Sequence, residues 1–350
     1  MHDFKEPKLS TEDQVKDYYK KLESSKDLQT NACCTTDSIP NYQKEILKNI
    51  EPEILDRFYG CGTPIPDVLD GITVLDLGSG TGRDAYLLSK LVGERGHVIG
   101  IDMTDEQLDV AKKYQDSQAK RFGFTKSNTT FTKGYIEDLA SAGIKSKSVD
   151  LVVSNCVINL SPDKPAVFKE IFRVLKEGGE MYISDVFSDR RISDDLRKDP
   201  VLYGECLSGA LYIEDFRRIL NECGCLDYRI TETRRLTINN KELEEKLGDI
   251  KFYSITVRAF KLNLEDRCED YGQTVTYKGS MENLSDQFVL DDHHTFKKGE
   301  AVKVCGNSSD MILKTRFADH FTYTGDKSIH LGAFDCNPIQ CDEPASGGCC

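Results

Sequence analysis

The cysteines are the residues of this chain with the most distinctive chemistry. The 350 residues include 13 cysteines, five of them in four distinctive stretches: "TNACCTT" with Cys33 and Cys34, "RFYGCG" with Cys61, "SNCVINL" with Cys156 and "YGECLSG" with Cys206. Their number is odd, their spacing is irregular and no Cys-x-x-Cys pair occurs, which disfavours a secreted disulfide framework and a structural zinc site. The thiols are therefore either inert core residues or groups that bind a soft ligand and change oxidation state.

Cys156 poses this choice most directly, because it follows an apolar run at residues 149–154 that predicts a buried strand. A transferase often carries a polar or acidic catalytic group at such a strand end. The turn "SNCVIN" offers no Asp, Glu or His at this place, only the thiol.

The elements that must position these thiols alternate regularly after residue 72. Strands are predicted at 73–77, 97–101, 129–132, 149–154 and 180–185, and helices at 83–92, 106–122 and 165–176, the last ending at Gly178-Gly179. This alternation predicts an α/β fold with a doubly wound, mostly parallel sheet. Such folds bind ligands at the carboxyl edge of the sheet, where we expect Cys156 to lie and the Cys206 segment to fold over.

The rest of the chain indicates further parts on either side of this sheet. Helices predicted at 11–22 and 42–59 form an N-terminal helical cap, residues 1–70. The central domain, residues 71–261, ends with a helix at 212–223 and a closing strand at 252–260. Short strands and one short helix then predict a small β-rich C-terminal domain at 262–335, followed by a Cys-rich disordered tail at 336–350.

A glycine-rich turn joins the first predicted strand to the helix that follows it. In "VLDLGSGTGRD", residues 74–84, Gly78, Gly80 and Gly82 are spaced two apart, unlike the G-x-G-x-x-G of dinucleotide-binding proteins. Glycines permit positive φ and let the backbone approach a ligand, and the helix offers free N–H groups to a carboxylate. By itself, this turn is equally compatible with an ordinary βα connection.

Two acidic residues at neighbouring strand ends favour the ligand-binding interpretation. Asp102 ends the second strand, where its carboxylate can accept both hydrogen bonds of a ribose diol, and Met103 can pack against an adenine face. Glu137 follows the third strand and can accept a hydrogen bond from an adenine amino group. Together with the glycines, they predict a site for an adenosyl ligand.

This set resembles the class I methyltransferases that use S-adenosyl-L-methionine, over about residues 70–260 at the level of the fold. The resemblance implies a Rossmann-like sheet with S-adenosyl-L-methionine as cofactor. Within this class, a carbon or oxygen methyltransferase of the quinone or sterol type is an alternative. The predicted cofactor-binding residues are Tyr59, Asp76, Gly78, Ser79, Gly80, Arg83, Asp102, Met103, Ile136, Glu137 and Asn155.

A more specific resemblance extends over nearly the whole chain. The stretches "QTNAC", "YGCG", "LDLGSGTGRD", "VSNCVINL", "RVLKEGGE" and "GECLSGALY", and the Gly-Gly-Cys-Cys ending, are similar to the arsenite methyltransferase family in order and spacing. This resemblance implies methyl transfer to trivalent arsenic, with Cys33, Cys61, Cys156 and Cys206 as catalytic residues and arsenic ligands. The first cysteine is doubled, so Cys33 and Cys34 compete for this role, and the preceding "QTNA" favours Cys33.

The chemistry of arsenic agrees with this assignment. Trivalent arsenic is soft and prefers thiolates, and it keeps a lone pair that can attack a sulfonium methyl group without a general base. Methylation makes the arsenic formally pentavalent, and two thiols can reduce it again by forming a disulfide. An external dithiol reductant, supplied by the thioredoxin or glutathione system, must then reopen that disulfide. The expected substrates are arsenite and methylated arsenicals, and the expected products are mono- and dimethylated arsenicals.

Composition limits the other possible partners. The net charge of −13 argues against nucleic acid and anionic membranes, and no apolar run is long enough to span a bilayer. The N-terminus lacks the apolar core of a signal peptide, so we expect a cytoplasmic (cytosolic) protein, and a monomer. A non-enzymatic alternative is a thiol-rich metalloid-binding or redox protein on a methyltransferase scaffold. The histidines His293 and His294 follow two aspartates, but neighbouring residues of a strand face opposite ways, which disfavours a metal site.

Overall fold

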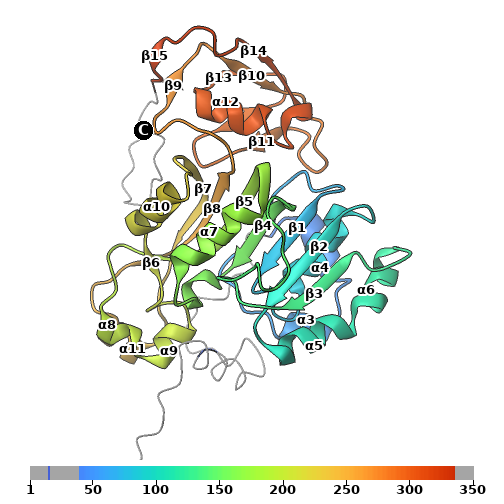
Figure 1. Ribbon diagram of the computed structural model, residues 1–350, viewed down its shortest axis with the longest axis vertical. Coiled ribbons are helices and arrows are strands. Elements are labelled where there is room, and N and C mark those ends of the chain that lie inside the picture. The colour runs from blue at the N-terminus through green and yellow to red at the C-terminus, as the bar shows by residue number, and fades with distance from the viewer. Residues whose placement is uncertain (1–14, 16–38, 336–350) are drawn as a thin grey trace, which may run out of the picture.

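The computed structural model describes residue 15 and residues 39–335 of the chain. At its centre is an eight-stranded sheet in the order β3-β2-β1-β4-β5-β8-β7, with β6 paired to β5 (Figure 1). The strands are β1 (Thr73–Leu77), β2 (His97–Asp102), β3 (Thr129–Lys133), β4 (Val149–Asn155), β5 (Leu175–Ser188), β6 (Leu211–Tyr212), β7 (Tyr228–Arg235) and β8 (Phe252–Phe260). Strands β1 to β6 pair parallel with one another, whereas β8 pairs antiparallel with β5 and β7. The predicted doubly wound, mostly parallel sheet is therefore confirmed.

Both faces of the sheet are buried under helices, which explains the continuous apolar runs of its strands. In β4, Val152 packs into one core with the helices after β4 and β6, while Leu151 and Val153 pack into a second core with the helix after β1. The helices are α2 (Asn41–Leu47), α3 (Pro52–Asp56), α4 (Arg83–Val92), α5 (Asp105–Lys113), α6 (Gln115–Phe122), α7 (Lys164–Val174), α8 (Asp194–Arg197), α9 (Pro200–Gly204), α10 (Ile213–Glu222) and α11 (Lys241–Leu247), with a 3₁₀ turn η2 (Ile158–Leu160).

Two predicted helices are each split in two. The helix expected at 42–59 is instead α2 and α3, because Pro52 has no N–H to donate and keeps Glu51 extended, at φ −58° and ψ 133°. The helix expected at 106–122 breaks at Tyr114, whose φ of −103° and ψ of 2° leave the helical region. The hydroxyl of Tyr114 donates to Glu53 of α3, so a tertiary contact accompanies this break.

The helix predicted to end at Gly178-Gly179 ends earlier, at Val174. Strand β5 begins immediately, at Leu175, which is buried and pairs with Val149 of β4. The N–H of Gly178 donates to the carbonyl of Lys261, so the glycines belong to the sheet and not to a helix end. Pairing with β4 therefore overrides the local stop signal.

The C-terminal elements pack beyond the amino end of β5 around an aromatic cluster that also includes Phe260, the last residue of β8 (Figure 1). A buried ion-pair chain joins them to the sheet: Arg258 donates to Glu180 at 2.7 Å, and Arg316 pairs with the same carboxylate at 2.5 Å. The elements are β9 (Glu269–Asp270), β10 (Thr274–Tyr277), β11 (Gln287–Val289), β12 (Thr295–Lys297), β13 (Ala301–Lys303), α12 (Gly306–Leu313), η3 (Ala318–His320), β14 (Phe321–Thr324) and β15 (Gly332–Ala333). The exact domain boundaries stay a prediction, and the helix predicted at 11–22 (apart from Val15) and the tail at 336–350 lie outside the described residues.

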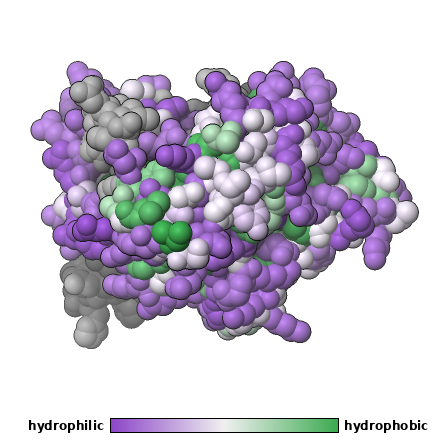
Figure 2. All heavy atoms as spheres, turned by 90° about the horizontal axis from the view of Figure 1, so that it is seen from above, coloured by the Kyte–Doolittle hydropathy of each residue, from purple (hydrophilic) through white to green (hydrophobic). Residues whose placement is uncertain are grey.

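Viewed from the end that carries these C-terminal elements, the surface is mostly hydrophilic, with small separated hydrophobic areas (Figure 2). Among the described residues, no helix has the length and apolar character that a membrane span requires.

Candidate active site

The glycine turn after β1 forms one wall of a pocket at the carboxyl edge of the sheet. Gly78, Gly80 and Gly82 all have positive φ, at 66°, 52° and 93°, which a side chain would strain. A Cβ atom at Gly78 would also lie 2.4 Å from the side chain of Val157, whereas one at Gly80 would meet nothing within 4 Å. The turn therefore packs tightly on one side and leaves open space for a ligand on the other.

Asp102 fixes this turn from the end of β2. One carboxylate oxygen accepts the N–H of Gly80 at 2.9 Å, and the other accepts the N–H of Thr104 at 2.8 Å. Burial raises the pKa of Asp102, and these backbone donors oppose that effect. Each oxygen has a second lone pair, so the carboxylate can still receive two hydroxyl groups from a ligand.

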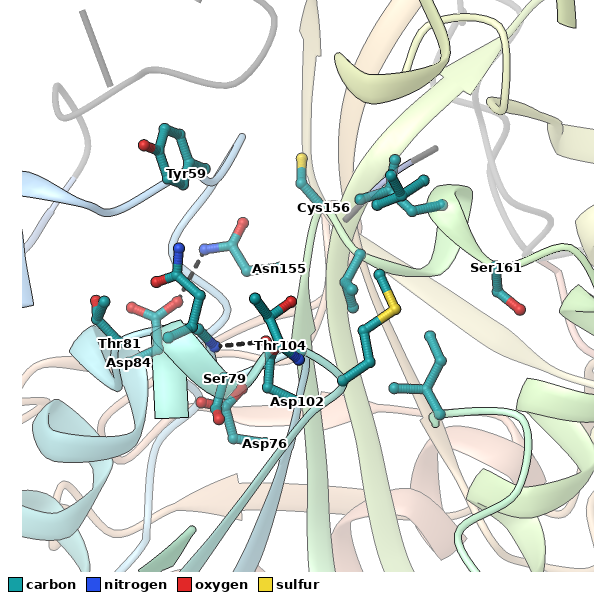
Figure 3. Close-up of a pocket in the computed structure, with 18 of the residues that line it drawn as sticks. Tyr59, Asp76, Ser79, Thr81, Asp84, Asp102, Thr104, Asn155, Cys156 and Ser161 are labelled. Carbon is teal, nitrogen blue, oxygen red and sulfur yellow. Dashed lines mark hydrogen bonds between the residues drawn. The ribbon is translucent and has the colours of Figure 1, made fainter. Parts of the chain in front are cut away.

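All of the predicted cofactor-binding residues line this one pocket. They are Tyr59, Asp76, Gly78, Ser79, Gly80, Arg83, Asp102, Met103, Ile136, Glu137 and Asn155. Figure 3 shows Asp76, Asp84 and Asp102 gathered on one side, with Cys156 apart from them at the end of β4. Sequence reasoning missed Asp84, Thr104 and Gln107, which also line the pocket, although Asp84 is the last residue of the glycine motif at 74–84.

Several buried polar atoms in the pocket have no hydrogen-bond partner among the described residues, including Asp76 Oδ2, Ser79 Oγ and Gln107 Oε1. Burial, followed by the charges of Asp84 and Asp102, raises the pKa of Asp76 well above its usual range. Unpartnered acceptors beside three carboxylates suit a cationic ligand that brings its own donors. S-adenosyl-L-methionine is such a ligand, because it carries an ammonium, a sulfonium and a ribose diol. The residues present therefore fit this cofactor.

Asn155 links the pocket to the first described cysteine. Its Oδ1 accepts the N–H groups of Cys61 at 3.1 Å and of Gly62 at 3.2 Å. Its Nδ2 donates to the carbonyl of Gly62 at 2.8 Å and to Asp84 at 2.9 Å. The loop of Cys61 comes before β1 in the sequence. A single buried amide, that of Asn155, therefore holds this loop at the end of β4.

Three of the four predicted functional cysteines meet at this edge. Cys61 and Cys156 are joined by a disulfide, across 95 positions of sequence. Cys206, which follows α9, is buried and keeps its thiol, which donates to the carbonyl of Cys156 at 3.1 Å. Of these three, only Cys156 is among the described residues that line the pocket. Cys33 and Cys34 lie outside the described residues, so the choice between them stays a prediction.

The turn of Cys156 contains no acidic residue, but the tertiary structure brings one close to its sulfur. A carboxylate oxygen of Asp185, in β5, lies within 4.8 Å of the sulfurs of Cys61 and Cys156. Asp185 accepts from Asn159 Nδ2 at 2.7 Å and from the N–H of Val186 at 2.8 Å. Burial raises its pKa to about 7. Its place near the end of the fifth strand was the available signal, because parallel strands end at the same edge.

Lys164 contributes a cation behind this group. Its ammonium donates to the carbonyl of Ser161 at 3.0 Å. Burial lowers its pKa to about 8, although the negative charge of Asp185 acts in the opposite direction. The cysteines therefore lie near a buried acid and a half-buried amine that the sequence motifs did not reveal.

The cysteines and histidines away from this edge have structural contacts. Cys225 is buried and donates to the carbonyl of Asp227, and burial raises its pKa to about 12. Cys305 accepts the N–H of Ser308 at the start of α12. Asp291 lies close to Asp292 and His293, but it is already paired with Arg229 at 3.0 Å and with His294.

Comparisons with known proteins agree with this geometry. Residues 69–224 match the methyltransferase domain family, and residues 271–350 match the family described as the arsenite methyltransferase C-terminal domain. The chain is 53% identical to an arsenite methyltransferase of Aquipseudomonas alcaligenes, over 92% of this chain and 93% of the relative. It is 44% identical to the arsenite methyltransferase of Homo sapiens, over 96% of this chain and 86% of the relative.

A solved structure extends the likeness to three dimensions. The crystal structure of an arsenic(III) S-adenosylmethionine methyltransferase from Chlamydomonas reinhardtii has 48% sequence identity and a TM-score of 0.83. The match covers 85% of this chain and 100% of that one. With a sheet, a pocket and a thiol cluster of the expected kind, and with relatives of this identity over most of their length, the chain belongs to the arsenite methyltransferase family.

Proposed function

We propose that the protein transfers methyl groups from S-adenosyl-L-methionine to trivalent arsenic held by cysteine thiols, giving mono- and dimethylated arsenicals. One observation carries this proposal: Cys61, Cys156 and Cys206 gather at the sheet edge, and Cys156 lines the pocket that fits the cofactor. Thiolates are the ligands that soft trivalent arsenic prefers. The proposed ligand set is Cys33, Cys61, Cys156 and Cys206.

The pocket residues have separate tasks in this proposal. Asp102 receives the ribose hydroxyls, Asp76 and Ser79 receive the polar groups of the methionine part, and Glu137 receives the adenine amino group. When bound, S-adenosyl-L-methionine supplies an electrophilic methyl group on a sulfonium. The thiols hold the arsenic so that its lone pair is available, which requires no proton to leave the nucleophile. Because the arsenic and the methyl group are then held in fixed positions, less entropy is lost when the transition state forms.

The Cys61–Cys156 disulfide supports a redox step in the same cycle. Reducing a methylated, pentavalent arsenic takes two electrons, and two thiols that become a disulfide supply both. The protein then needs an external dithiol, which we assign to the thioredoxin or glutathione system. We further propose that the protein acts as a monomer in the cytosol.

The disulfide also favours a second candidate function, a thiol-rich protein that binds metalloids or senses redox state without turnover. Incubation with methyl-labelled S-adenosyl-L-methionine, arsenite and a dithiol, followed by chromatographic separation of the arsenicals, distinguishes the two. We expect the molar amount of labelled mono- and dimethylated products to exceed the molar amount of enzyme. Arsenite bound stoichiometrically, with no labelled arsenical formed, would reject the methyltransferase and favour the binding protein.

A further inference from the structure

The turn that follows Cys156 is attached to the sheet by one buried side chain. A backbone hydrogen bond joins the N–H of Cys156 to the carbonyl of Ser184 in β5 at 2.9 Å. Three residues later comes Asn159, which lies in η2 and is 1% exposed. Its Nδ2 donates to Asp185 Oδ1 at 2.7 Å and to the carbonyl of Val186 at 2.6 Å, so both of its amide protons are used. This amide therefore extends the attachment to β5 beyond the end of β4.

The segment that carries Cys206 packs on the same turn. The thiol of Cys206 donates to the carbonyl of Cys156 at 3.1 Å. The hydroxyl of Tyr203 donates at 3.2 Å to the carbonyl of the last residue of η2. The backbone of Gly209 lies directly against Asn159, because a Cβ atom at Gly209 would be only 2.2 Å from the Asn159 carbonyl oxygen. Three contacts therefore fix the Cys206 segment on the turn that Asn159 attaches to β5.

The backbone conformation of the two cysteines depends on such contacts. Both Cys156 and Cys206 have positive φ, which a residue with a side chain keeps only where its surroundings hold it. The loop of Cys61 is held by a different side chain, the amide of Asn155. The site therefore consists of two cysteines fixed on one turn and a third cysteine that a separate amide holds in place.

We propose that Asn159 is a positioning residue for arsenic: by fixing η2 against β5, it sets the spacing at which Cys156 and Cys206 bind one trivalent arsenic together. Two thiols that are already held in place lose little freedom when they bind the same atom, whereas loosely held thiols must first be ordered. Asn159 is not among the described residues that line the cofactor pocket, so contact with the cofactor does not explain it. The inference rests on the proposed function and names the side chain that organises two of its arsenic ligands.

Protection of individual cysteines by phenylarsine oxide tests this role. Each molecule condenses with two thiols, forms two arsenic–sulfur bonds and releases one water, without a change of oxidation state. The assay uses the reduced full-length enzyme carrying Cys61→Ser, which removes the disulfide and leaves Cys156 and Cys206 as the pair at the sheet edge. After titration with phenylarsine oxide, N-ethylmaleimide is added for a time in which both cysteines react when the arsenical is absent. Peptide mass spectrometry then measures alkylation at each cysteine separately.

The concentration of phenylarsine oxide that half-protects Cys156 and Cys206 should rise about tenfold when Asn159→Ala is added, because two side chains must then be ordered on binding. Gly209→Ala is a second route to the same result. Gly209 is not among the glycines with positive φ, so alanine fits its backbone, and the added Cβ acts only by pushing the Cys206 segment away from the turn. The half-protecting concentration should rise in this variant too.

Asn307→Ala is the matched control. Asn307 is also 1% exposed, and its Nδ2 likewise donates to one carboxylate and one carbonyl, those of Asp227 at 3.0 Å and Glu265 at 2.9 Å. Its loss should lower the melting temperature as the loss of Asn159 does, because both remove a buried amide with the same kind of partners. The half-protecting concentration should nevertheless stay at the value of the parent enzyme.

Two outcomes would overturn the inference: an unchanged half-protecting concentration in folded Asn159→Ala, or an equal rise in Asn307→Ala, which would assign the effect to general stability. If Asn159→Ala does not fold, Gly209→Ala decides in its place. The assay measures binding without turnover, so neither outcome bears on whether the protein methylates arsenic. Formation of labelled methylated arsenicals by the wild-type enzyme tests the proposed function separately.

Discussion

The thiol of Cys206 donates to the backbone carbonyl of Cys156 at 3.1 Å, so the two cysteines are linked even though they do not form a disulfide. Both have left-handed backbones, with φ of 64° at Cys206 and 55° at Cys156. This conformation costs a non-glycine residue about 1–2 kcal/mol, which the surrounding contacts must offset. The fold therefore holds these two sulfurs in fixed positions before any substrate binds.

Because Cys156 and Cys206 are held together at the sheet edge, we expect the four cysteines to have different roles in methylation. Cys156→Ser and Cys206→Ser should abolish methylation of arsenite and of trivalent arsenic that already carries one methyl group. Cys33→Ser and Cys61→Ser should abolish the first step but retain much of the second, because a methylated substrate has one site fewer for a thiol. Separate assays with the two substrates measure this, and Cys223→Ser, at a half-buried cysteine, is the control. Equal loss of the second step in Cys33→Ser and Cys156→Ser would contradict the division.

Asp102→Ala should weaken binding of S-adenosyl-L-methionine by about 1.5–3 kcal/mol, because it removes a charged acceptor of the ribose hydroxyls. It also removes the acceptor of the Gly80 N–H, which loosens the glycine turn. Titration calorimetry on the reduced enzyme measures the change. Asp105→Ala, at an exposed aspartate that pairs with Lys133, is the control and should bind normally. An unchanged affinity in Asp102→Ala would remove Asp102 from the cofactor site.

Lys164 should make stability depend on pH in the alkaline range. Burial lowers its pKa from 10.5 to about 8, so between these values the unfolded chain binds more protons than the folded one. Stability therefore rises with pH from about 8 to 10.5, as the cost of burying the ammonium disappears, by at most about 3 kcal/mol. Lys164→Met should remove this rise.

Urea unfolding at several pH values measures the difference between wild type and variant. Lys169→Met, at an exposed lysine of the same helix, is the control and should keep the wild-type pH dependence. If the stability of Lys164→Met relative to wild type did not change between pH 8 and 10, the lowered pKa assigned to the half-buried Lys164 would be wrong.

The methyl transfer step should not require a general base, although Asp185 lies beside the thiols. Enzyme preloaded with arsenite has no free thiol left to titrate among its ligands, and an arsenic lone pair loses no proton. Single-turnover rates from pH 5.5 to 9 should therefore be nearly flat, and Asp185→Asn should give the same profile. An acidic limb near pH 7, where Asp185 titrates, that vanishes in Asp185→Asn would identify the carboxylate as a base and reject the lone-pair mechanism.

Strongly periodic segments could be predicted well, and interrupted ones could not. Helix α4 has the predicted bounds, Arg83–Val92, because a glycine turn starts it and Gly93 ends it. The apolar spacing of 42–59 predicts one helix, but Pro52 keeps the residue before it extended and divides the segment into two helices. The early start of β5 could not be predicted locally, since it depends on pairing with β4.

The sequence by itself determined the residue types and the edge of the sheet where they gather. Apolar runs specified the parallel strands, and parallel strands end together, so Gly80, Asp102 and Cys156 had to meet around one pocket. Only the tertiary structure decided what surrounds the sulfurs. Asp185, Ser184 and Thr256 come from β5 and β8, and Asn155 brings in Cys61 from 94 positions away. No local pattern encodes these contacts, because they depend on which side chains face each other after strands and loops distant in sequence have packed together.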